Sequence, residues 1–347
     1  MSIASIFWQE RTSLVQSFHI AIIHGMITTW KRCNNQGATP QEPDFVGGLV
    51  LESTPLFYSA LKSILRPHGI SISVSGVFCH QTPQVAFDPP QKTGCELGDI
   101  LFVYVHTPKV GASRRNALLC QAKASAKQTY RLVSADKVQL RLYTDWPDFV
   151  YQRSSCHLTG QKRSVTPKSP HAGAQYLLID DRPLDDPMSG LLGFPGTYPI
   201  GCCMPDEFLH DHNHLAYELF DLFLFRSGRP FEDRHSASAK KDWSQIVWDL
   251  IDIGVRKSFN RKNSGRYKSS RIAGEILGLL DGSSFNRASA SNCFSTAAEV
   301  LGGNGASTLF GRQDGPPDNS NTEKNHWEPE AGVSVVLIET SERPPDE

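Results

Sequence analysis

The sequence predicts an α/β fold followed by a helical C-terminal region, and two patterns carry this prediction. Up to about residue 180, segments whose apolar residues recur every three or four positions alternate with short segments rich in β-branched and aromatic residues. The first spacing is typical of amphipathic helices and the second composition is typical of strands. In chain order these segments read helix, strand, strand, strand, helix, strand. Beyond about residue 200, helical spacing dominates.

Two helices and a strand precede the centre of the chain. Residues 7–33 predict an N-terminal cap helix, and the polar residues 34–43, which contain Gly and Pro, predict a loop. Residues 45–65 predict a second helix with Pro55 at its start or at a kink, because proline is tolerated in the first helical turn. Residues 70–79 alternate apolar and polar side chains, as a half-buried strand does.

Two apolar segments, 95–105 and 116–123, are separated by a polar turn and predict a β-hairpin. Asp99 lies at the start of the first strand, whereas Gln121 and Lys123 lie at the end of the second. Because alternate residues of a strand point to the same face, Gln121 and Lys123 share one face of the hairpin. We therefore expect a carboxylate, an amide oxygen and an ammonium to converge, a combination that can hold a divalent metal and activate water.

The second half of the chain contains a helix, a strand and then several longer regions. Residues 138–143 predict a helix that ends at Pro147, and residues 175–180 predict the strand that follows it. The basic, Ser-rich residues 153–170 predict an exposed insertion. The remaining expected regions are a mainly helical region at 182–301 with helices near 215–225 and 243–259, a flexible linker at 302–332, and a terminal strand with its tail at 333–347. This strand is either a last strand of the sheet or an edge addition.

Charge and composition narrow the function classes. The formal net charge is −1, so nucleic-acid binding would have to come from local patches. No apolar run approaches the roughly 20 residues that span a bilayer, and the N-terminus lacks a basic segment followed by an apolar one. We therefore expect a cytoplasmic protein with no membrane partner. None of the eight cysteines forms a C-x-x-C pair, so we expect them to be small buried side chains.

This order of elements resembles the PD-(D/E)XK nuclease superfamily, also called restriction-endonuclease-like, over about residues 44–181. Gly98-Asp99 opens the second core strand, and Gln121-Ala122-Lys123 closes the third. The resemblance implies an α-β-β-β-α-β core with a mixed sheet flanked by helices. It also implies that Asp99 binds Mg²⁺ or Mn²⁺, that Gln121 supplies a second oxygen, and that Lys123 orients or deprotonates the attacking water.

Gln121 departs from the common pattern, which has an acid at this position; the Gln form occurs among members that resemble Mrr-type restriction enzymes. A neutral amide adds no charge, so the metal requires a further acid. The resemblance points to Glu52 near the first core helix, and Glu96 is a second candidate. Each of these residues also has a purely structural interpretation. Asp99 could cap a turn, Lys123 could be a solvated strand end, and Glu52 and Glu96 could face solvent.

Two further clusters have both a functional and a structural interpretation. His210, His212 and His214 alternate, so on a strand they would face one zinc ion, whereas as a polar helix entry Asp211 or Asn213 would act as the N-cap. A basic stretch with interleaved aromatic residues would bind nucleic-acid phosphates and stack on bases, or would be a solvated helix end. This stretch contains Arg256, Lys257, Phe259, Arg261, Lys262, Arg266, Tyr267, Lys268 and Arg271.

These patterns and the resemblance predict a metal-dependent nuclease that hydrolyses DNA phosphodiester bonds, with defence against foreign DNA as the role that the superfamily suggests. Cleavage of both strands of a duplex with one site per chain favours a homodimer. The alternative is a non-catalytic nucleic-acid-binding or protein-interaction module on the same fold.

Overall fold

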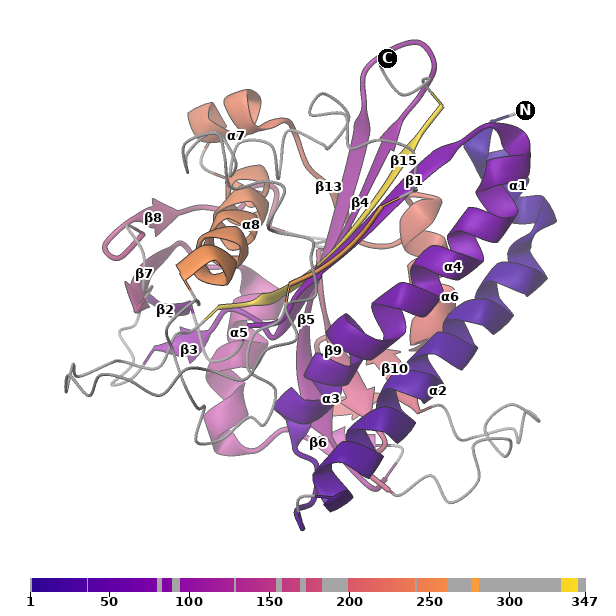
Figure 1. Cartoon of the computed structure of the whole chain (residues 1–347). Coiled ribbons are helices and arrows are strands. Elements are labelled where there is room, and N and C mark those ends of the chain that lie inside the picture. The colour runs from indigo at the N-terminus through magenta and orange to yellow at the C-terminus, as the bar shows by residue number, and fades with distance from the viewer. Residues whose placement is uncertain are drawn as a thin grey trace, which may run out of the picture.

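The computed structural model describes residues 2–35, 37–79, 83–88, 94–127, 129–153, 158–168, 173–182, 199–240, 242–260, 276–280 and 332–342. In these residues, strands form a mixed sheet with helices on both faces, which confirms the predicted α/β class (Figure 1). None of the helices in these ranges is long and apolar enough to cross a membrane.

The main sheet has nine strands in the described residues. Eight of them follow one another in the order β12 (Asn213–His214), β10 (Ile200–Cys203), β9 (Ala174–Ile179), β5 (Arg114–Ala124), β4 (Ile100–Thr107), β15 (Ser334–Ser341), β1 (Ser71–Val77) and β14 (Ile276–Leu280). The ninth, β13 (Arg229–Pro230), pairs with the start of β5. Strands β4 and β5 are the predicted antiparallel pair, and β9 runs parallel to β5. Helix α5 (Lys137–Asp145) lies between β5 and β9 in the chain, as a parallel connection requires.

Strand β15 is the last strand of the described residues, as predicted, but it lies inside the sheet, so it is not an edge addition. It runs parallel to β4 on one side and antiparallel to β1 on the other. Its residues Val335 to Ile338 are all buried, because both faces of this part of the sheet are covered by helices. A continuous apolar run is typical of a strand buried on both faces, whereas a half-exposed edge strand alternates.

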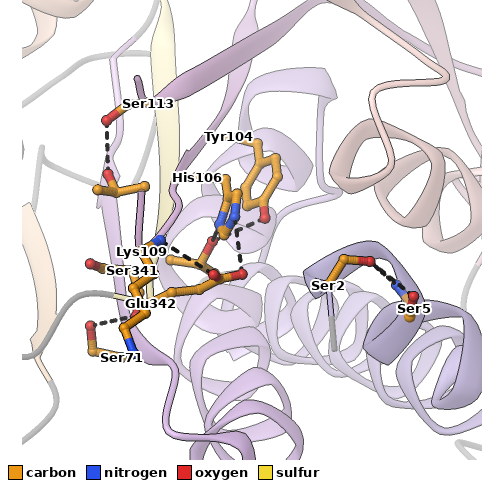
Figure 2. Close-up of polar contacts among 11 residues, drawn as sticks. Ser2, Ser5, Ser71, Tyr104, His106, Lys109, Ser113, Ser341 and Glu342 are labelled. Carbon is orange, nitrogen blue, oxygen red and sulfur yellow. Dashed lines mark hydrogen bonds and ion pairs between the residues drawn. The ribbon is translucent and has the colours of Figure 1, made fainter. Parts of the chain in front are cut away.

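The end of β15 is held by polar contacts to its two neighbouring strands (Figure 2). Tyr104 and His106 of β4 each form a 3.0 Å hydrogen bond with the hydroxyl of Thr340. The second ring nitrogen of His106 lies 3.5 Å from the carboxylate of Glu342. On the other side, the Ser71 hydroxyl donates to the carbonyl oxygen of Ser341 at 3.2 Å. These contacts fix the register of the strand at the sheet end shown in Figure 2.

One face of the sheet is covered by α6 (Leu215–Phe223) and by the N-terminal helices. The latter are α1 (Ile3–Gln9), α2 (Arg11–Asn35), α3 (Glu42–Gly48), a π-helical segment over Leu49–Ser53, α4 (Thr54–Leu65) and a 3₁₀ turn over Arg66–His68. Phe18 of α2 packs edge-to-face on Phe57 and on Phe223, with ring centroids 5.4 and 5.6 Å apart. Pro55 lies near the start of α4, directly after the π-helical segment, which continues into α4 without a break. Because proline has no N–H to donate inside a helix, it is found where the regular hydrogen-bond ladder changes, as it does here.

The other face carries α5, α7 (Arg234–Lys240), α8 (Trp243–Asn260) and a small second sheet. The small sheet has the order β3 (Cys95–Glu96), β2 (Gln84–Phe87), β7 (Phe149–Arg153) and β8 (Lys162–Arg163). A short ladder of β6 (Thr129–Arg131) with β11 (Phe208–His210), and a 3₁₀ turn over Ser134–Asp136, complete the described elements.

Two regions differ in detail from the sequence prediction. The stretch 153–170, predicted to be an exposed insertion, contains β8, and Leu158, Arg163 and Val165 are buried there. Arg163 is drawn inward because Asp249 of α8 pairs with it at 2.7 Å. The region 182–301 has the expected helices near 215–225 and 243–259 but also contributes β10 and β12, which continue the main sheet. Residues 302–331 of the expected linker lie outside the described residues.

Candidate functional site

The backbone of Asp99 is held by strands on both sides at the start of β4. Its N–H donates to the carbonyl oxygen of Cys120 on β5 at 2.9 Å, and its carbonyl oxygen accepts from the N–H of Ser334 at the start of β15 at 2.9 Å. The preceding Gly98 allows this close approach, because a Cβ there would lie 2.7 Å from the side chain of Leu119. The position of Asp99 therefore depends on the C-terminal strand as well as on the predicted hairpin.

The Asp99 carboxylate is directed toward β5, where the hairpin prediction expected its partners. Its Oδ2 accepts a 2.7 Å hydrogen bond from the backbone N–H of Ala122 and a further hydrogen bond from the side-chain amide of Gln121. Gln121 is buried, and its Oε1 has no hydrogen-bond partner among the described residues. A buried acceptor without a donor costs free energy, so this oxygen is suited to a ligand.

Lys123 lies at the end of β5 and forms an ion pair with Asp136, whose Oδ1 is 2.8 Å from the ammonium nitrogen. Burial lowers the pKa of Lys123, but the Asp136 hydrogen bond and the charge of Glu42 outweigh it, so the pKa is raised overall. Lys123 is therefore an ammonium at neutral pH. It can stabilise negative charge but has no lone pair with which to deprotonate water.

Two glutamates place negative charge near Asp99. Burial and the Glu96 carboxylate raise the pKa of Asp99 to about 8, although the Ala122 hydrogen bond opposes the rise. The pKa of Glu96 is also raised by burial, with Lys123 lowering it and Glu42 raising it. Glu42 lies at the start of α3, and its Oε1 accepts a 3.0 Å hydrogen bond from the N–H of Ala124. The site thus concentrates carboxylates around one ammonium, and like charges in one site resist joint ionisation.

Glu52, the helix acid expected by the resemblance, points elsewhere. Its carboxylate lies 3.5 Å from Arg32 of α2. The acid from the first helical region that acts on Asp99 and Lys123 is instead Glu42. The sequence prediction missed Glu42 because it began this helix near residue 45. The Glu-Pro pair at 42–43 was the available signal, since proline favours the first helical turn.

Asp136 is the second residue that the sequence analysis did not single out. It lies at the end of the 3₁₀ turn over Ser134–Asp136, immediately before α5. Its other oxygen, Oδ2, accepts from the N–H of Val133 at 3.1 Å, so the same carboxylate caps the turn and pairs with Lys123. The capping position was readable from the sequence, but its proximity to Lys123 arises from the crossover connection between β5 and β9.

Carboxylate and amide oxygens are the ligand types that a hard divalent cation takes, and the site contains two such carboxylates and one such amide. Asp99 and Glu96 supply carboxylate oxygens whose mutual repulsion a cation would relieve, and Gln121 supplies the unpartnered amide oxygen. In the ranges that the structure describes, no three His, Cys, Asp or Glu side chains are grouped so that they could hold a metal ion. A cation would therefore depend on Asp99, Glu96 and Gln121, with water completing the coordination as Mg²⁺ commonly allows.

The three alternating histidines do not face one another in a zinc site. His214 is the N-cap of α6, and its Nδ1 accepts the N–H of Ala216 at 2.9 Å. Because Nδ1 accepts, Nε2 of the neutral ring carries the proton and donates to Nδ1 of His19, 2.6 Å away. His212 lies 3.9 Å from Glu218, and His210 is exposed. The helix-entry interpretation is therefore correct, with His214 as the cap in place of Asp211 or Asn213.

The basic stretch falls largely outside the described residues. Arg256 and Lys257 belong to α8, but the side chains of this part of the helix are not described, and Arg261, Lys262, Arg266, Lys268 and Arg271 lie outside the described ranges.

Cys202 and Cys203 are buried on β10, where burial raises the pKa of both thiols.

No protein-family model matches this chain, and neither a curated protein nor a solved structure matches it significantly.

Proposed function

We propose that the chain is a metal-dependent nuclease of the PD-(D/E)XK type, which hydrolyses DNA phosphodiester bonds at the Asp99 site. The observation that carries the proposal is the contact between the Gln121 side-chain amide and the Asp99 carboxylate, with Lys123 two residues further along β5, at one end of the β4–β5 pair. The amide nitrogen faces Asp99 in this contact, so the amide would turn over to present its unpartnered oxygen to a cation. The proposal is also supported by the chain order α4, β1, β4, β5, α5, β9, which is that of an α-β-β-β-α-β core once the strands outside the main sheet are set aside. In the sheet itself, β15 lies between β1 and β4.

Each residue has a role that follows from its surroundings. Asp99, Glu96 and Gln121 would hold Mg²⁺ or Mn²⁺, which when bound supplies Lewis acidity and lowers the pKa of a coordinated water. Lys123 keeps its proton and stabilises the charge that develops on the phosphate. Asp136 holds the Lys123 side chain in place, and Glu42 adds the negative charge that the neutral Gln121 lacks.

The same proposal includes a cytoplasmic setting and a role in defence against foreign DNA. It also includes a homodimer, because two copies would present one site to each strand of a duplex.

One observation favours a second candidate, a non-catalytic nucleic-acid-binding or protein-interaction module. Oδ2 of Asp99 is occupied by hydrogen bonds from Gln121 and Ala122, and Lys123 is occupied by Asp136. In such a module these contacts would serve only to hold the end of β5 against β4.

The test is incubation of the purified protein with plasmid and linear DNA in Mg²⁺, in Mn²⁺ and in EDTA, beside Asp99→Ala and Lys123→Ala. We expect metal-dependent cleavage in the wild-type protein only. Loss of Lys123 leaves the Asp136 carboxylate without its partner and could destabilise the fold. Lys123→Gln can still donate a hydrogen bond to Asp136, so this variant and a thermal melt of each variant show whether lost cleavage is due to lost folding. Equal cleavage by the Asp99→Ala, Lys123→Ala double variant would refute the proposed site, and DNA binding without cleavage in any metal would support the second candidate.

A further inference from the structure

A cavity of about 620 Å³ lies on the helical face away from the N-terminal helices, between β8 and α7. Its lining residues are Asp148, Gln161, Lys162, Arg163, Ser164 and Lys240. Three of these side chains are cations and one is a carboxylate, and two of the cations, Arg163 and Lys240, are paired with carboxylates outside the lining. Figure 1 shows β8 and α7 beside α8, on the side of the sheet opposite α2 and α4. None of the roles proposed for the Asp99 site involves these residues.

The floor of the cavity is rigid because Arg163 is a buried cation held from several directions. Its Nε lies 2.7 Å from Oδ2 of Asp249 on α8, and both side chains are less than 5% exposed. Tyr151 of β7 also donates to this carboxylate, at 3.1 Å. Further hydrogen bonds run from the guanidinium of Arg163 to the carbonyl oxygen of Lys162 and to Gln161. A buried pair of this kind resists removal of either partner, so the floor keeps its shape.

The rim, in contrast, consists of exposed lysines in exchangeable ion pairs. Lys162 is 64% exposed and lies 3.0 Å from Asp148, which also pairs with Lys168 at 3.4 Å. Lys240 is 55% exposed and pairs with Glu232. Exposed pairs of this type contribute about 0–1 kcal/mol, so an incoming anion can replace the carboxylate at little cost. Since Asp148 is shared by two lysines, one positive charge at the rim is not neutralised.

The cavity is connected to the Asp99 site through the small sheet. Glu96 lies on β3 at one edge of this sheet, and Lys162 lies on β8 at the other edge, with β2 and β7 between them. Three steps between neighbouring strands amount to about 14 Å. A single duplex can bridge this separation, because each of its strands carries one phosphate per about 3.4 Å of helix axis.

We propose that the cavity is a phosphate-binding subsite, in which Lys162 and Lys240 contact the backbone of the DNA whose scissile phosphate is held at Asp99. The inference rests on the proposed function, because the ligand is the DNA that the Asp99 site would cleave. Each lysine replaces its carboxylate partner with a phosphate oxygen, and the buried Arg163–Asp249 pair below them holds the floor of the cavity in shape. The released counterions make binding at this subsite dependent on salt.

The test is fluorescence anisotropy with a labelled duplex of about 20 base pairs, in EDTA so that no cleavage occurs, over roughly 50–200 mM NaCl. We expect Lys162→Gln/Lys240→Gln to weaken binding at least tenfold near 0.1 M salt. The slope of log Kd against log salt should fall by about 1.8, since each phosphate contact contributes about 0.9. Lys162→Arg/Lys240→Arg keeps the charge and should bind as the wild-type protein does. Lys62→Gln, on α4 across the sheet, is the control for unspecific loss of a lysine.

Asp148→Asn supplies a variant with the opposite expected sign. It frees Lys162 and Lys168 from their carboxylate, so DNA binding should tighten severalfold, whereas a purely structural role for Asp148 predicts no change or a loss. The inference is overturned if the wild-type protein does not bind the duplex, if the double Gln variant keeps the wild-type Kd and slope, or if Asp148→Asn weakens binding. If these binding changes occur but no metal supports cleavage, the subsite stands and the proposed catalysis fails.

Discussion

Replacement of Asp99 by Asn should stabilise the metal-free protein, although the proposal makes Asp99 essential for cleavage. The pKa of Asp99 is about 8, against 3.8 for an unperturbed aspartate. The folded state therefore binds more protons than the unfolded state between these two pH values. The free energy of unfolding accordingly falls as pH rises through this window, and the contribution is unfavourable at neutral pH.

The magnitude follows from the size of the shift. Between the unperturbed pKa of 3.8 and pH 7 lie about three pH units, and each costs the folded protein about 1.4 kcal/mol. Removing the ionisable group would therefore raise the free energy of unfolding at pH 7 by at most about 4 kcal/mol. Asp99 shares its site with Glu96, so part of the shift belongs to the pair, and Asn can still accept the hydrogen bond from Ala122; we therefore expect a gain of about 2 kcal/mol. For a chain of this size the melting temperature would rise by roughly 3–6 °C. At pH 5 the gain should be less than about 1 kcal/mol.

Thermal melts of both proteins at pH 5 and 7, in EDTA and in MgCl₂, test this reasoning. MgCl₂ should raise the melting temperature of the wild-type protein but not that of Asp99→Asn. Asp148→Asn is the matched control, because hydrogen bonds from Ser164 and Lys162 lower the pKa of Asp148 to about 2 and its replacement should not stabilise. A lower melting temperature for Asp99→Asn in EDTA at pH 7 would show that the Asp99 charge supports the fold, which contradicts the reasoning.

Three further predictions concern the C-terminal strand, the second glutamate and the histidine cap. Truncation after residue 331 removes five buried apolar side chains, Val333, Val335, Val336, Leu337 and Ile338. Burial of each such side chain stabilises the fold by roughly 1.5–3 kcal/mol, so the loss is roughly 7–15 kcal/mol, as large as the free energy of unfolding of a typical domain. Calorimetry should show no cooperative transition; a native-like melt would mean that β15 is dispensable. Glu42→Gln keeps the hydrogen bond from Ala124 but removes a negative charge, so we expect kcat/KM for metal-dependent cleavage to fall at least tenfold. Glu52→Gln is the control and should change kcat/KM less than twofold, because Glu52 pairs with Arg32 instead. Equal effects of the two substitutions would exclude a special role for Glu42. Burial and His19 lower the pKa of His214 to about 3, so the unfolded state binds more protons between about pH 3 and 6.5, and stability is lost as pH falls through this window. The free energy of unfolding should fall by about 1.4 kcal/mol at pH 5.5. For His214→Asn, which keeps a helix-capping side chain, denaturant titration should show a free energy of unfolding that depends less on pH. Identical pH dependence in the two proteins would exclude His214 as the cause.

Local patterns predicted the elements that carry the site. The β4–β5 hairpin and the proximity of Asp99 to Gln121 follow from an antiparallel pair of known register, and Pro147 marks the end of α5 as expected. The glutamate that the first helical region contributes to the site was harder to predict, because both Glu42 and Glu52 lie in that region. The path of the chain through α3 and the π-helical segment decides that Glu42, and not Glu52, contacts β5.

The sequence by itself determined the α/β class, the longer helices, the main-sheet strands β1, β4, β5, β9 and β15, and the hairpin that brings Asp99 to Gln121, because these depend on spacings within a few residues. Only the tertiary structure decided the insertion of β15 between β1 and β4, the pairing of Lys123 with Asp136 and the burial of Arg163 against Asp249. These contacts join segments whose separation in the chain leaves no periodic signal. The physical reason is that a buried strand or charge is defined by the partners that surround it, and those partners are assembled only when the chain folds.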